Sequence, residues 1–585
     1  MNFNYTIFRR IFAFFVVFAV VSAGYPPISR AEMTPEPDTG YSAKTAMSGR
    51  DFMIVTANPL ATKAGYEILK RGGTAADAGV AAQLVLGLVE PQSSGLGGGG
   101  FALYFDKKSG RLISLDGRET APATVGKHLF RAANGQPMNF FDAAIGGRAV
   151  GVPGTPALLE KLHQWYGKLE WRDLFSPAIS LSEDGFEVTP RLAKMVMKER
   201  ARLHKDTTVR LYFSPDGVTP VYEGYLLRNL EYAKTLRMMA LGGAKVFYGG
   251  EIADEIIQKI RDIPSNPSSM TIEDLKDYQV KERPPVCGVY RGYKICSMGE
   301  PSSGGLTLLN ILGILQYFDL HSLGAHNPQS WHLIGEASRL AFADRNFYMA
   351  DPDFVKTPGL SLLDPGYLKS RAALISGKPM TSAMPGIPPG WDGATPAPDN
   401  TIKPPGTTHI SIIDRYGNVL SMTSSIEYAF GSHVMAAGFL LNNQLTDFSF
   451  VAEKDGLSVA NAVAGGKRPR SSMTPVIMFD PQGEPVLVTG SAGGSAIIGY
   501  VLQTILNIVD WDMDVQSALD APHILQRGSG YEIEAGQGAL KAGLEQIGHP
   551  VKVKDLNSGL TAIHKAGTLY FGAADPRREG IAMGE

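Results

Sequence analysis

The residues around Gly406 have types that could generate a catalytic nucleophile. Gly406-Thr407-Thr408 follows a proline-rich stretch and leads directly into the alternating pattern of a β-strand. One class of amidase cuts its own chain before a Ser, Thr or Cys, and the α-amine released by the cut then acts as the base. We therefore treat Thr407 as a candidate nucleophile and the Gly406–Thr407 bond as a candidate cleavage site.

The strand that begins at Thr407 is predicted to form a hairpin. Residues 414–418, Asp-Arg-Tyr-Gly-Asn, fit a three-residue loop whose glycine takes the left-handed conformation. If the first and last of them lie opposite each other, Thr407 lies opposite Ser425 on the same face of the sheet. Glu427 follows on that face. A second hydroxyl would then lie beside the candidate nucleophile, although a plain surface hairpin fits the same pattern.

A run of polar and glycine residues follows between apolar strands. Gly493-Gly494 comes after one strand and before a helix, so its N–H groups could bind an oxyanion, or the pair could be only a tight turn. The other polar positions of this region are Gln444, Asp447, Arg468, Ser471 and Ser472.

Several other chemistries are not indicated. The chain has no nucleophile elbow, zincin motif or Walker loop, and its eleven histidines lack ligand spacing, so we expect no metal and no cofactor. Gly95-x-Gly97-x-x-Gly100 resembles a dinucleotide fingerprint, but a turn precedes it and a strand follows it. We expect a close backbone crossing or a polar-ligand loop there. A net charge of −2 gives no reason to expect nucleic acid as a partner.

The first 31 residues have the order of a secretory signal. Arg9-Arg10 precede an apolar run of 13 residues ending at Ala23, and small residues lead up to Ala31. A spanning helix needs about 20 apolar residues. We expect cleavage after Ala31, with Ala23 as second choice and an uncleaved anchor as the alternative. The mature protein would be periplasmic or secreted, with no stable membrane span.

Cys287 and Cys296 are the two cysteines of the chain, and an Arg-Gly turn lies midway between them. The hairpin register places them opposite each other in a closely spaced, non-hydrogen-bonded pair. A cross-strand disulfide is feasible in an oxidising compartment, and two reduced, buried thiols fit the pattern equally well.

The order of elements indicates a layered fold. Helical periodicity covers 57–86 and most of 155–290, whereas 376–406 has the composition of an exposed linker. Hairpins and strands dominate from 407, and helices return beyond 495. Strands between helical blocks predict a layered α/β architecture.

Seven spaced motifs resemble those of the γ-glutamyltransferases. They are Gly97-Gly98-Gly99-Gly100-Phe101, Asp116-x-Arg118-Glu119-x-Ala121-Pro122, Pro301-Ser302-Ser303-Gly304-Gly305, Thr407-Thr408-His409, Leu440-Leu441-Asn442-Asn443-Gln444 with Asp447-Phe448-Ser449, Lys467-Arg468-Pro469-x-Ser471-Ser472-Met473-x-Pro475 and Gly490-Ser491-x-Gly493-Gly494-Ser495. The match runs in order from about residue 50 to the C-terminus. It implies an N-terminal-nucleophile (Ntn) hydrolase fold, a four-layer αββα sandwich built as one composite domain from two subunits.

The resemblance implies a self-processing γ-glutamyltransferase and glutathione hydrolase. The precursor would cut itself into a large subunit, residues 32–406, and a small subunit, residues 407–585, which remain together as a heterodimer. Thr407 would attack the γ-amide carbonyl of glutathione or another γ-glutamyl donor. Water, or an amino-acid or peptide acceptor, would then resolve the acyl-enzyme.

Site roles follow residue by residue from the matching motifs. Ser425 would hydrogen-bond the nucleophile, and the N–H groups of Gly493 and Gly494 would bind the oxyanion. The remaining residues would bind the free glutamyl end of the donor. Its α-carboxylate would be bound by Arg118 with Ser471 and Ser472, and its α-ammonium by Asp447 with Glu427. Gln444 would lie beside them.

Two departures from the family pattern bear on substrate choice. Position 427 is Glu where many members have Asn, and loop 450–466 is short and lacks the gating Tyr of some bacterial relatives. A cephalosporin (glutaryl) acylase-like amidase is an alternative, but its substrate has no ammonium to pair with Asp447 and Glu427. An unprocessed, non-catalytic binding protein is a second alternative.

Overall fold

The computed structural model describes residues 39–585 except 265, 394–395, 400–405 and 529. The chain divides into two units, 1–34 and 35–585, and all described residues belong to the second. The predicted signal, residues 1–31, lies outside them. Within the described part of the chain, no helix is both long enough and apolar enough to cross a bilayer.

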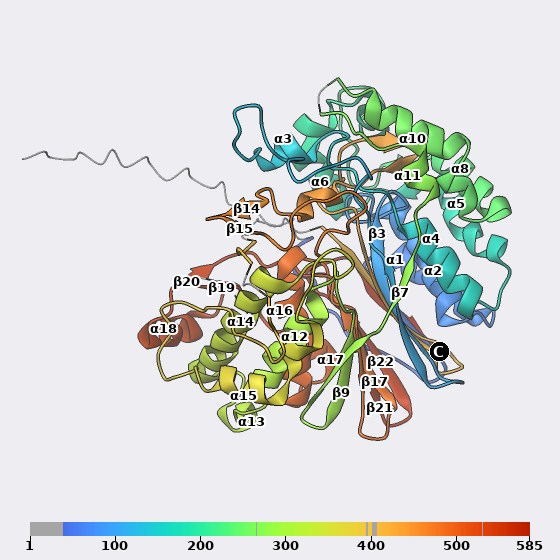
Figure 1. The fold of residues 1–585 in the computed structure, drawn as a ribbon. Coiled ribbons are helices and arrows are strands. Elements are labelled where there is room, and N and C mark those ends of the chain that lie inside the picture. Colours follow the sequence, from blue (N-terminus) through green and yellow to red (C-terminus); the bar gives the residue numbers. More distant parts are fainter. Residues whose placement is uncertain (1–38, 265, 394–395, 400–405, 529) are drawn as a thin grey trace, which may run out of the picture. The chain divides into compact units, whose positions relative to one another are not determined.

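Two seven-stranded antiparallel sheets form the centre of this unit (Figure 1). The first contains, in spatial order, β1 (Met47–Gly49), β22 (Leu569–Ala574), β21 (Thr561–Ala566), β17 (Pro485–Gly490), β16 (Val476–Phe479), β9 (Tyr293–Ser297) and β8 (Val286–Tyr290). The second contains β23 (Ile581–Gly584), β2 (Met53–Thr56), β10 (Thr408–Ile413), β11 (Val419–Ser425), β3 (Gly99–Asp106), β4 (Arg111–Gly117) and β7 (Lys281–Arg283). Each sheet combines strands from both sides of Gly406.

The two sheets pack face to face, and side-chain alternation decides which residues meet. In β10, Ile410 and Ile412 belong to the core under the helices, whereas Ser411 faces the other sheet, with its Oγ 2.9 Å from Thr561 Oγ1 of β21. Phe105 of β3 and Phe479 of β16 meet edge to face across the same interface, with ring centroids 5.2 Å apart.

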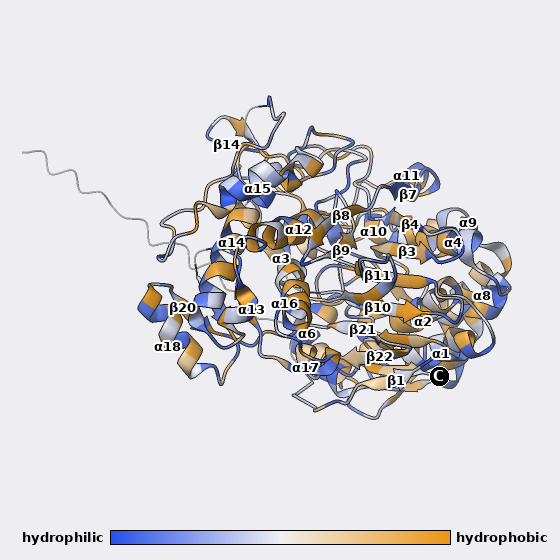
Figure 2. Ribbon diagram, turned by 90° about the horizontal axis from the view of Figure 1, so that it is seen from below, coloured by the Kyte–Doolittle hydropathy of each residue, from blue (hydrophilic) through white to orange (hydrophobic). Residues whose placement is uncertain are grey.

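A helical layer covers the outer face of each sheet and completes the αββα sandwich. Three helices that pack on the second sheet are α1 (Pro59–Lys70), α2 (Ala75–Val89) and α4 (Thr155–Tyr166). Three that pack on the first are α12 (Gly304–Leu315), α16 (Ile497–Val509) and α17 (Val515–Asp520), and α14 (Pro328–Tyr348) packs on α12. Figure 2 shows hydrophobic colour on α2, α12 and α16. The Ntn-hydrolase architecture predicted above is confirmed.

Further helices extend the layer over the second sheet, as predicted for 155–290. They include α5 (Ser176–Asp184), α6 (Pro190–Leu203), α7 (Thr207–Phe213), α8 (Leu230–Gly242) and α10 (Glu251–Arg261). Their apolar faces join the same hydrophobic core as α1 and α2.

The prediction of an exposed linker is only partly correct. The described residues of 376–399 contain no helix or strand, and many are exposed. However, Ala397 N donates to Ser458 O at 3.0 Å, and the Asp399 side chain is fully buried. The linker is held in place at this end because the Asp399 carboxylate has buried partners. These partners are distant from it in the sequence.

The glycine run at 95–100 is a close backbone crossing. A Cβ on Gly97 would lie 2.1 Å from the carbonyl oxygen of Leu440, and one on Gly98 would lie 2.1 Å from that of Ser425. Strand β3 follows the run, not the helix that a dinucleotide site requires.

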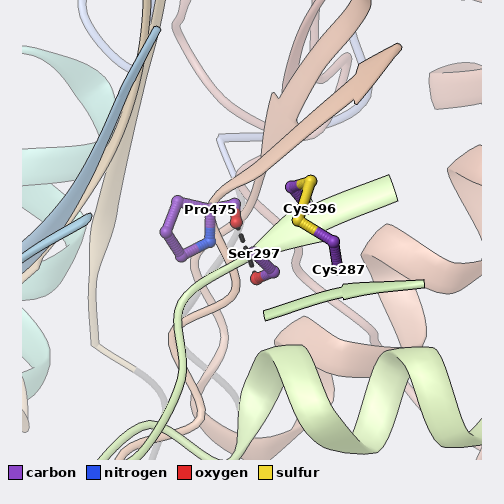
Figure 3. Close-up of a disulfide and its surroundings, with 4 residues drawn as sticks. All are labelled: Cys287, Cys296, Ser297 and Pro475. Carbon is purple, nitrogen blue, oxygen red and sulfur yellow. Dashed lines mark hydrogen bonds between the residues drawn. A yellow bond between two sulfur atoms is a disulfide. The ribbon is translucent and has the colours of Figure 1, made fainter. Parts of the chain in front are cut away.

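Cys287 of β8 and Cys296 of β9 are opposite each other and form a disulfide (Figure 3). The next residue, Ser297, donates a hydrogen bond of 2.7 Å from its Oγ to the carbonyl oxygen of Pro475. This bond joins the end of β9 to the residue before β16.

Candidate active site

Strand ends from both sheets meet at one edge and surround a pocket. In the second sheet these are the start of β10 and the ends of β11 and β4. In the first sheet they are the start of β16 and the end of β17. The pocket is lined by Arg118, Gly406, Thr407, Ser425, Glu427, Gln444, Asp447, Ser471, Ser472, Met473, Gly494, Ser495 and Ile497. Every predicted site residue except Gly493 lines it.

The predicted hairpin register is confirmed. Thr408 pairs with Ser424, and Asp414 N donates to Asn418 O at 3.0 Å, so Thr407 lies opposite Ser425. The Oγ atoms of Thr407 and Ser425 are 3.4 Å apart. Gly417 has φ 80°, as the loop requires.

The carbonyl of Gly406 lies between these two hydroxyls. Ser425 Oγ donates to Gly406 O at 2.7 Å, and Thr407 Oγ1 also contacts this oxygen. Glu427 N donates to Ser425 Oγ at 2.8 Å, which fixes the hydroxyl. A Cβ on Gly406 would lie 1.9 Å from the carbonyl oxygen of Glu427, so only glycine fits at this position.

His409 of β10 lies close to Thr407 in the sequence, but its contacts are those of a buried structural residue. Its Nδ1 is 2.7 Å from Thr423 Oγ1, and its ring packs on Gly490. Burial lowers the pKa of His409 to about 3. A histidine that remains neutral at physiological pH and is enclosed between the sheets is poorly suited to proton transfer at Thr407.

The Gly493-Gly494 pair joins β17 to the start of α16 through the short helix η4 (Gly494–Ala496). Gly493 has φ 131° and Gly494 has φ 57°, both in the region that favours glycine. A Cβ on Gly493 would also lie 2.7 Å from the Tyr500 ring. Gly494 lines the pocket and Gly493 does not, so one of the two predicted N–H donors belongs to a residue of the cavity wall.

Arg118 and Asp447 form a buried ion pair at one end of the pocket. Arg118 Nη2 is 2.5 Å from Asp447 Oδ2, which also accepts from Gln444 Nε2 at 2.8 Å. Arg118 Nη1 has no hydrogen-bond partner among the described residues and lies 3.7 Å from Glu119. Burial raises the pKa of Glu119 to about 7, against the opposing effect of Arg118. The Arg118 guanidinium therefore lies between two carboxylates, those of Asp447 and Glu119.

Glu427 brings a second carboxylate to the pocket. Its φ is 79°, and its Oε2 accepts a hydrogen bond of 2.6 Å from Asn443 Nδ2. Together with Asp447 it places two carboxylates among the residues that line the pocket.

Arg345 of α14 is a supporting residue that sequence reasoning missed. Its Nη2 donates to Ser472 Oγ at 2.7 Å and its Nε donates to Ser303 Oγ at 2.8 Å. Ser303 Oγ in turn donates to Ser471 O at 2.6 Å. No local signal marks Arg345, because it reaches the two pocket serines only through the packing of α14.

The residues that line the pocket include none from loop 450–466, which is described throughout. Among the described residues, no group of three or more His, Cys, Asp or Glu side chains could hold a metal ion.

Comparisons with known proteins show which family the chain belongs to. The family described as Gamma-glutamyltranspeptidase matches residues 61–585. The chain is 36% identical over 577 residues to the glutathione hydrolase proenzyme of Bacillus subtilis (strain 168), covering 96% of each. It is 33% identical over 552 residues to the acylase ACY 1 proenzyme of Pseudomonas sp. (strain SE83), covering 92% of this chain and 94% of the acylase.

Solved structures give the same fold. The crystal structure of cephalosporin acylase from Bacillus halodurans superposes with a TM-score of 0.81 at 27% identity, covering 97% of this chain and 99% of the acylase. The fold, the pocket and these similarities show that the chain is an enzyme of the gamma-glutamyltranspeptidase family.

Proposed function

We propose that this protein is a self-processing γ-glutamyltransferase that hydrolyses glutathione and other γ-glutamyl amides or transfers the γ-glutamyl group to amino acids and peptides. One observation carries the proposal: Gly406 O is bound by Ser425 Oγ at 2.7 Å and contacted by Thr407 Oγ1. The mature protein would be a periplasmic or secreted heterodimer of residues 32–406 and 407–585.

Self-cleavage would begin at this carbonyl. Thr407 Oγ1 attacks the Gly406 carbonyl carbon, the C–N bond breaks, and the hydroxyl proton passes to the nitrogen, which becomes the α-amine of Thr407. Water then hydrolyses the ester, leaving a carboxylate on Gly406 and a free hydroxyl on Thr407. Ser425 would stabilise the negative charge on the carbonyl oxygen during the first step.

The released α-amine would serve as the base in turnover. Its pKa near 7.7–8.0 suits proton transfer at neutral pH. Thr407 Oγ1 attacks the γ-carbonyl of the donor while the amine takes the proton. The amine then returns the proton to the leaving nitrogen as the amide bond breaks. Water or an acceptor amine releases the γ-glutamyl group from the ester, with the Gly494 side of the pocket near the oxyanion.

The free glutamyl end of the donor carries both charges, and the pocket offers a partner for each. Arg118 would bind the α-carboxylate with help from Ser471 and Ser472. Asp447 and Glu427 would bind the α-ammonium, and Gln444 would hold Asp447 in place through its 2.8 Å hydrogen bond.

Acylase activity is the second candidate, because an acylase proenzyme and a cephalosporin acylase are among the similar proteins. A glutaryl group has no ammonium, so it would leave Asp447 and Glu427 without a cationic substrate partner. The discriminating assay compares turnover of γ-glutamyl-p-nitroanilide and glutaryl-p-nitroanilide. Faster turnover of the glutaryl compound would overturn the donor assignment.

The cleavage step is tested by a denaturing gel with N-terminal sequencing, run beside Thr407→Ala. We expect two fragments from the wild type, the smaller beginning at Thr407, and one full-length band from the variant. A single wild-type band, or a small fragment with another N-terminus, would contradict the proposal and favour a non-catalytic binding protein.

A further inference from the structure

A buried ion pair joins the linker before the proposed cleavage site to the wall of the pocket. Asp399 precedes Thr407 by eight residues, and its Oδ2 accepts a hydrogen bond of 2.8 Å from Arg470 Nη2. The two side chains are 0% and 1% exposed. Arg470 directly precedes Ser471, so this pair connects the linker to the segment that carries the pocket serines.

Asn461 extends the pair to Asp447. Its Nδ2 donates to Asp399 Oδ2 and to the carbonyl oxygen of Asp447, both at 2.8 Å. Its Oδ1 accepts from Arg470 N at 3.0 Å. Only the Nδ2 end of the amide can donate, so the Asp399 carboxylate, the Asp447 carbonyl and the Arg470 N–H together favour one orientation of Asn461.

Arg470 connects the same network to Arg118. Its carbonyl oxygen accepts a 3.4 Å hydrogen bond from Arg118 Nη2. Its Nη1 donates to the carbonyl oxygens of Arg345 and Met349, at 3.0 and 3.3 Å. Asp399 is therefore linked through one residue, Asn461 or Arg470, to each member of the Arg118–Asp447 pair.

Main-chain bonds hold Asp399 from two directions. Asp399 N donates to Asn346 O at 2.9 Å, and Ala397 N donates to Ser458 O at 3.0 Å. These anchors lie upstream of Gly406, so a cut after Gly406 breaks none of them.

We propose that Asp399 is a positioning residue for the glutamyl end of the pocket, and that it stays in place after cleavage as a contribution of the large subunit. This inference rests on the proposed function. Loss of the carboxylate would leave the Arg470 guanidinium buried without its counter-charge and would remove one of the three contacts that hold the Asn461 amide. Asp447 would then be held less firmly, and donor binding would weaken more than the chemical step at Thr407.

The test is steady-state kinetics of Asp399→Asn with γ-glutamyl-p-nitroanilide. We expect KM to rise about tenfold with kcat within about threefold of wild type. Asp392→Asn is the matched control, because Asp392 lies in the same linker in an exposed pair with Lys356, and its KM should not change. Adding Arg470→Met to Asp399→Asn should recover part of the lost affinity for the donor, because the double variant no longer buries the Arg470 guanidinium without a counter-charge. An unchanged KM in Asp399→Asn, with only a lower melting temperature, would overturn the proposal.

A second variant covers the case in which Asp399→Asn fails to fold or self-cleave. Asn461→Leu leaves the Asp399–Arg470 pair intact and removes the amide that reaches Asp447, so it should also raise KM, and an unchanged KM would contradict the proposal. Failure of the proposed function is a separate result. If the wild type prefers glutaryl-p-nitroanilide, that preference overturns the γ-glutamyl assignment, and the Asp399 comparison is then made with the substrate that is turned over.

Discussion

Ser425 Oγ donates a hydrogen bond of 2.7 Å to the carbonyl oxygen of Gly406, the residue on the acyl side of the proposed cleavage site. This oxygen becomes negative when Thr407 Oγ1 attacks the carbonyl carbon. The same Ser425 hydroxyl lies 3.4 Å from Thr407 Oγ1, so it can contact the nucleophile both before and after the cut.

Replacing Ser425 by Ala should slow self-cleavage by about 10²-fold, the usual cost of removing one donor from an oxyanion. A time course of the precursor band on denaturing gels measures the rate. Ser424→Ala is the control, because Ser424 faces away and donates to Gln83 Oε1. Equal cleavage rates in the two variants would remove Ser425 from the mechanism.

Replacing Asp447 by Asn should raise KM for γ-glutamyl-p-nitroanilide by about 10²-fold or more, because the variant lacks the charge for the ammonium and leaves the buried Arg118 without its hydrogen-bonded carboxylate. Steady-state kinetics give the value. Asp455→Asn, an exposed change in loop 450–466, should behave as wild type. If the two variants have the same KM, the ammonium site lies elsewhere.

Acid should destabilise the protein partly through His409. Its pKa falls from 6.5 to about 3 on burial, so its contribution to stability is complete above pH 6.5 and is lost as pH falls from 6.5 towards 3. His409→Gln, made in the uncleaved Thr407→Ala background, should reduce the slope of unfolding free energy against pH by up to about 1.4 kcal/mol per pH unit. Exposed His326→Gln should leave the slope unchanged. Identical slopes in Thr407→Ala with and without His409→Gln would contradict this assignment.

The Cys287–Cys296 disulfide closes a short loop, with a sequence separation of 9. Replacing both cysteines by Ser should lower the free energy of unfolding by about 2–3 kcal/mol. Denaturant unfolding of the Thr407→Ala precursor, with and without reductant, measures the difference, and reductant should not affect the Ser variant. Labelling of two thiols in denatured, unreduced protein would show that the pair is reduced.

Local chemistry made much of the site predictable. The loop at 414–418 depends on five consecutive residues, so its register could be extended to Thr407 and Ser425 before any tertiary contact was known. The layered fold likewise follows from alternating strands between amphipathic helices.

Contacts between distant segments were not predictable in the same way. Arg345 and Asn461 contact pocket residues, and Asp399 contacts Asn461, only after α14, the linker and loop 450–466 have packed together. The composition of the linker predicted that it would be fully exposed. Proline content indicates only whether the backbone is regular, and it does not indicate which carboxylate pairs with a buried arginine.

The central claim is that Thr407 becomes both the first residue of the small subunit and the nucleophile. Mass spectrometry of the small subunit tests it directly. One sample is taken before a γ-glutamyl donor is added, and a second is quenched rapidly with acid after the donor has been added. We predict a chain of residues 407–585 that gains the mass of one γ-glutamyl group, located on the N-terminal peptide. A small subunit with another first residue, or an acyl group on any other peptide, would contradict the claim.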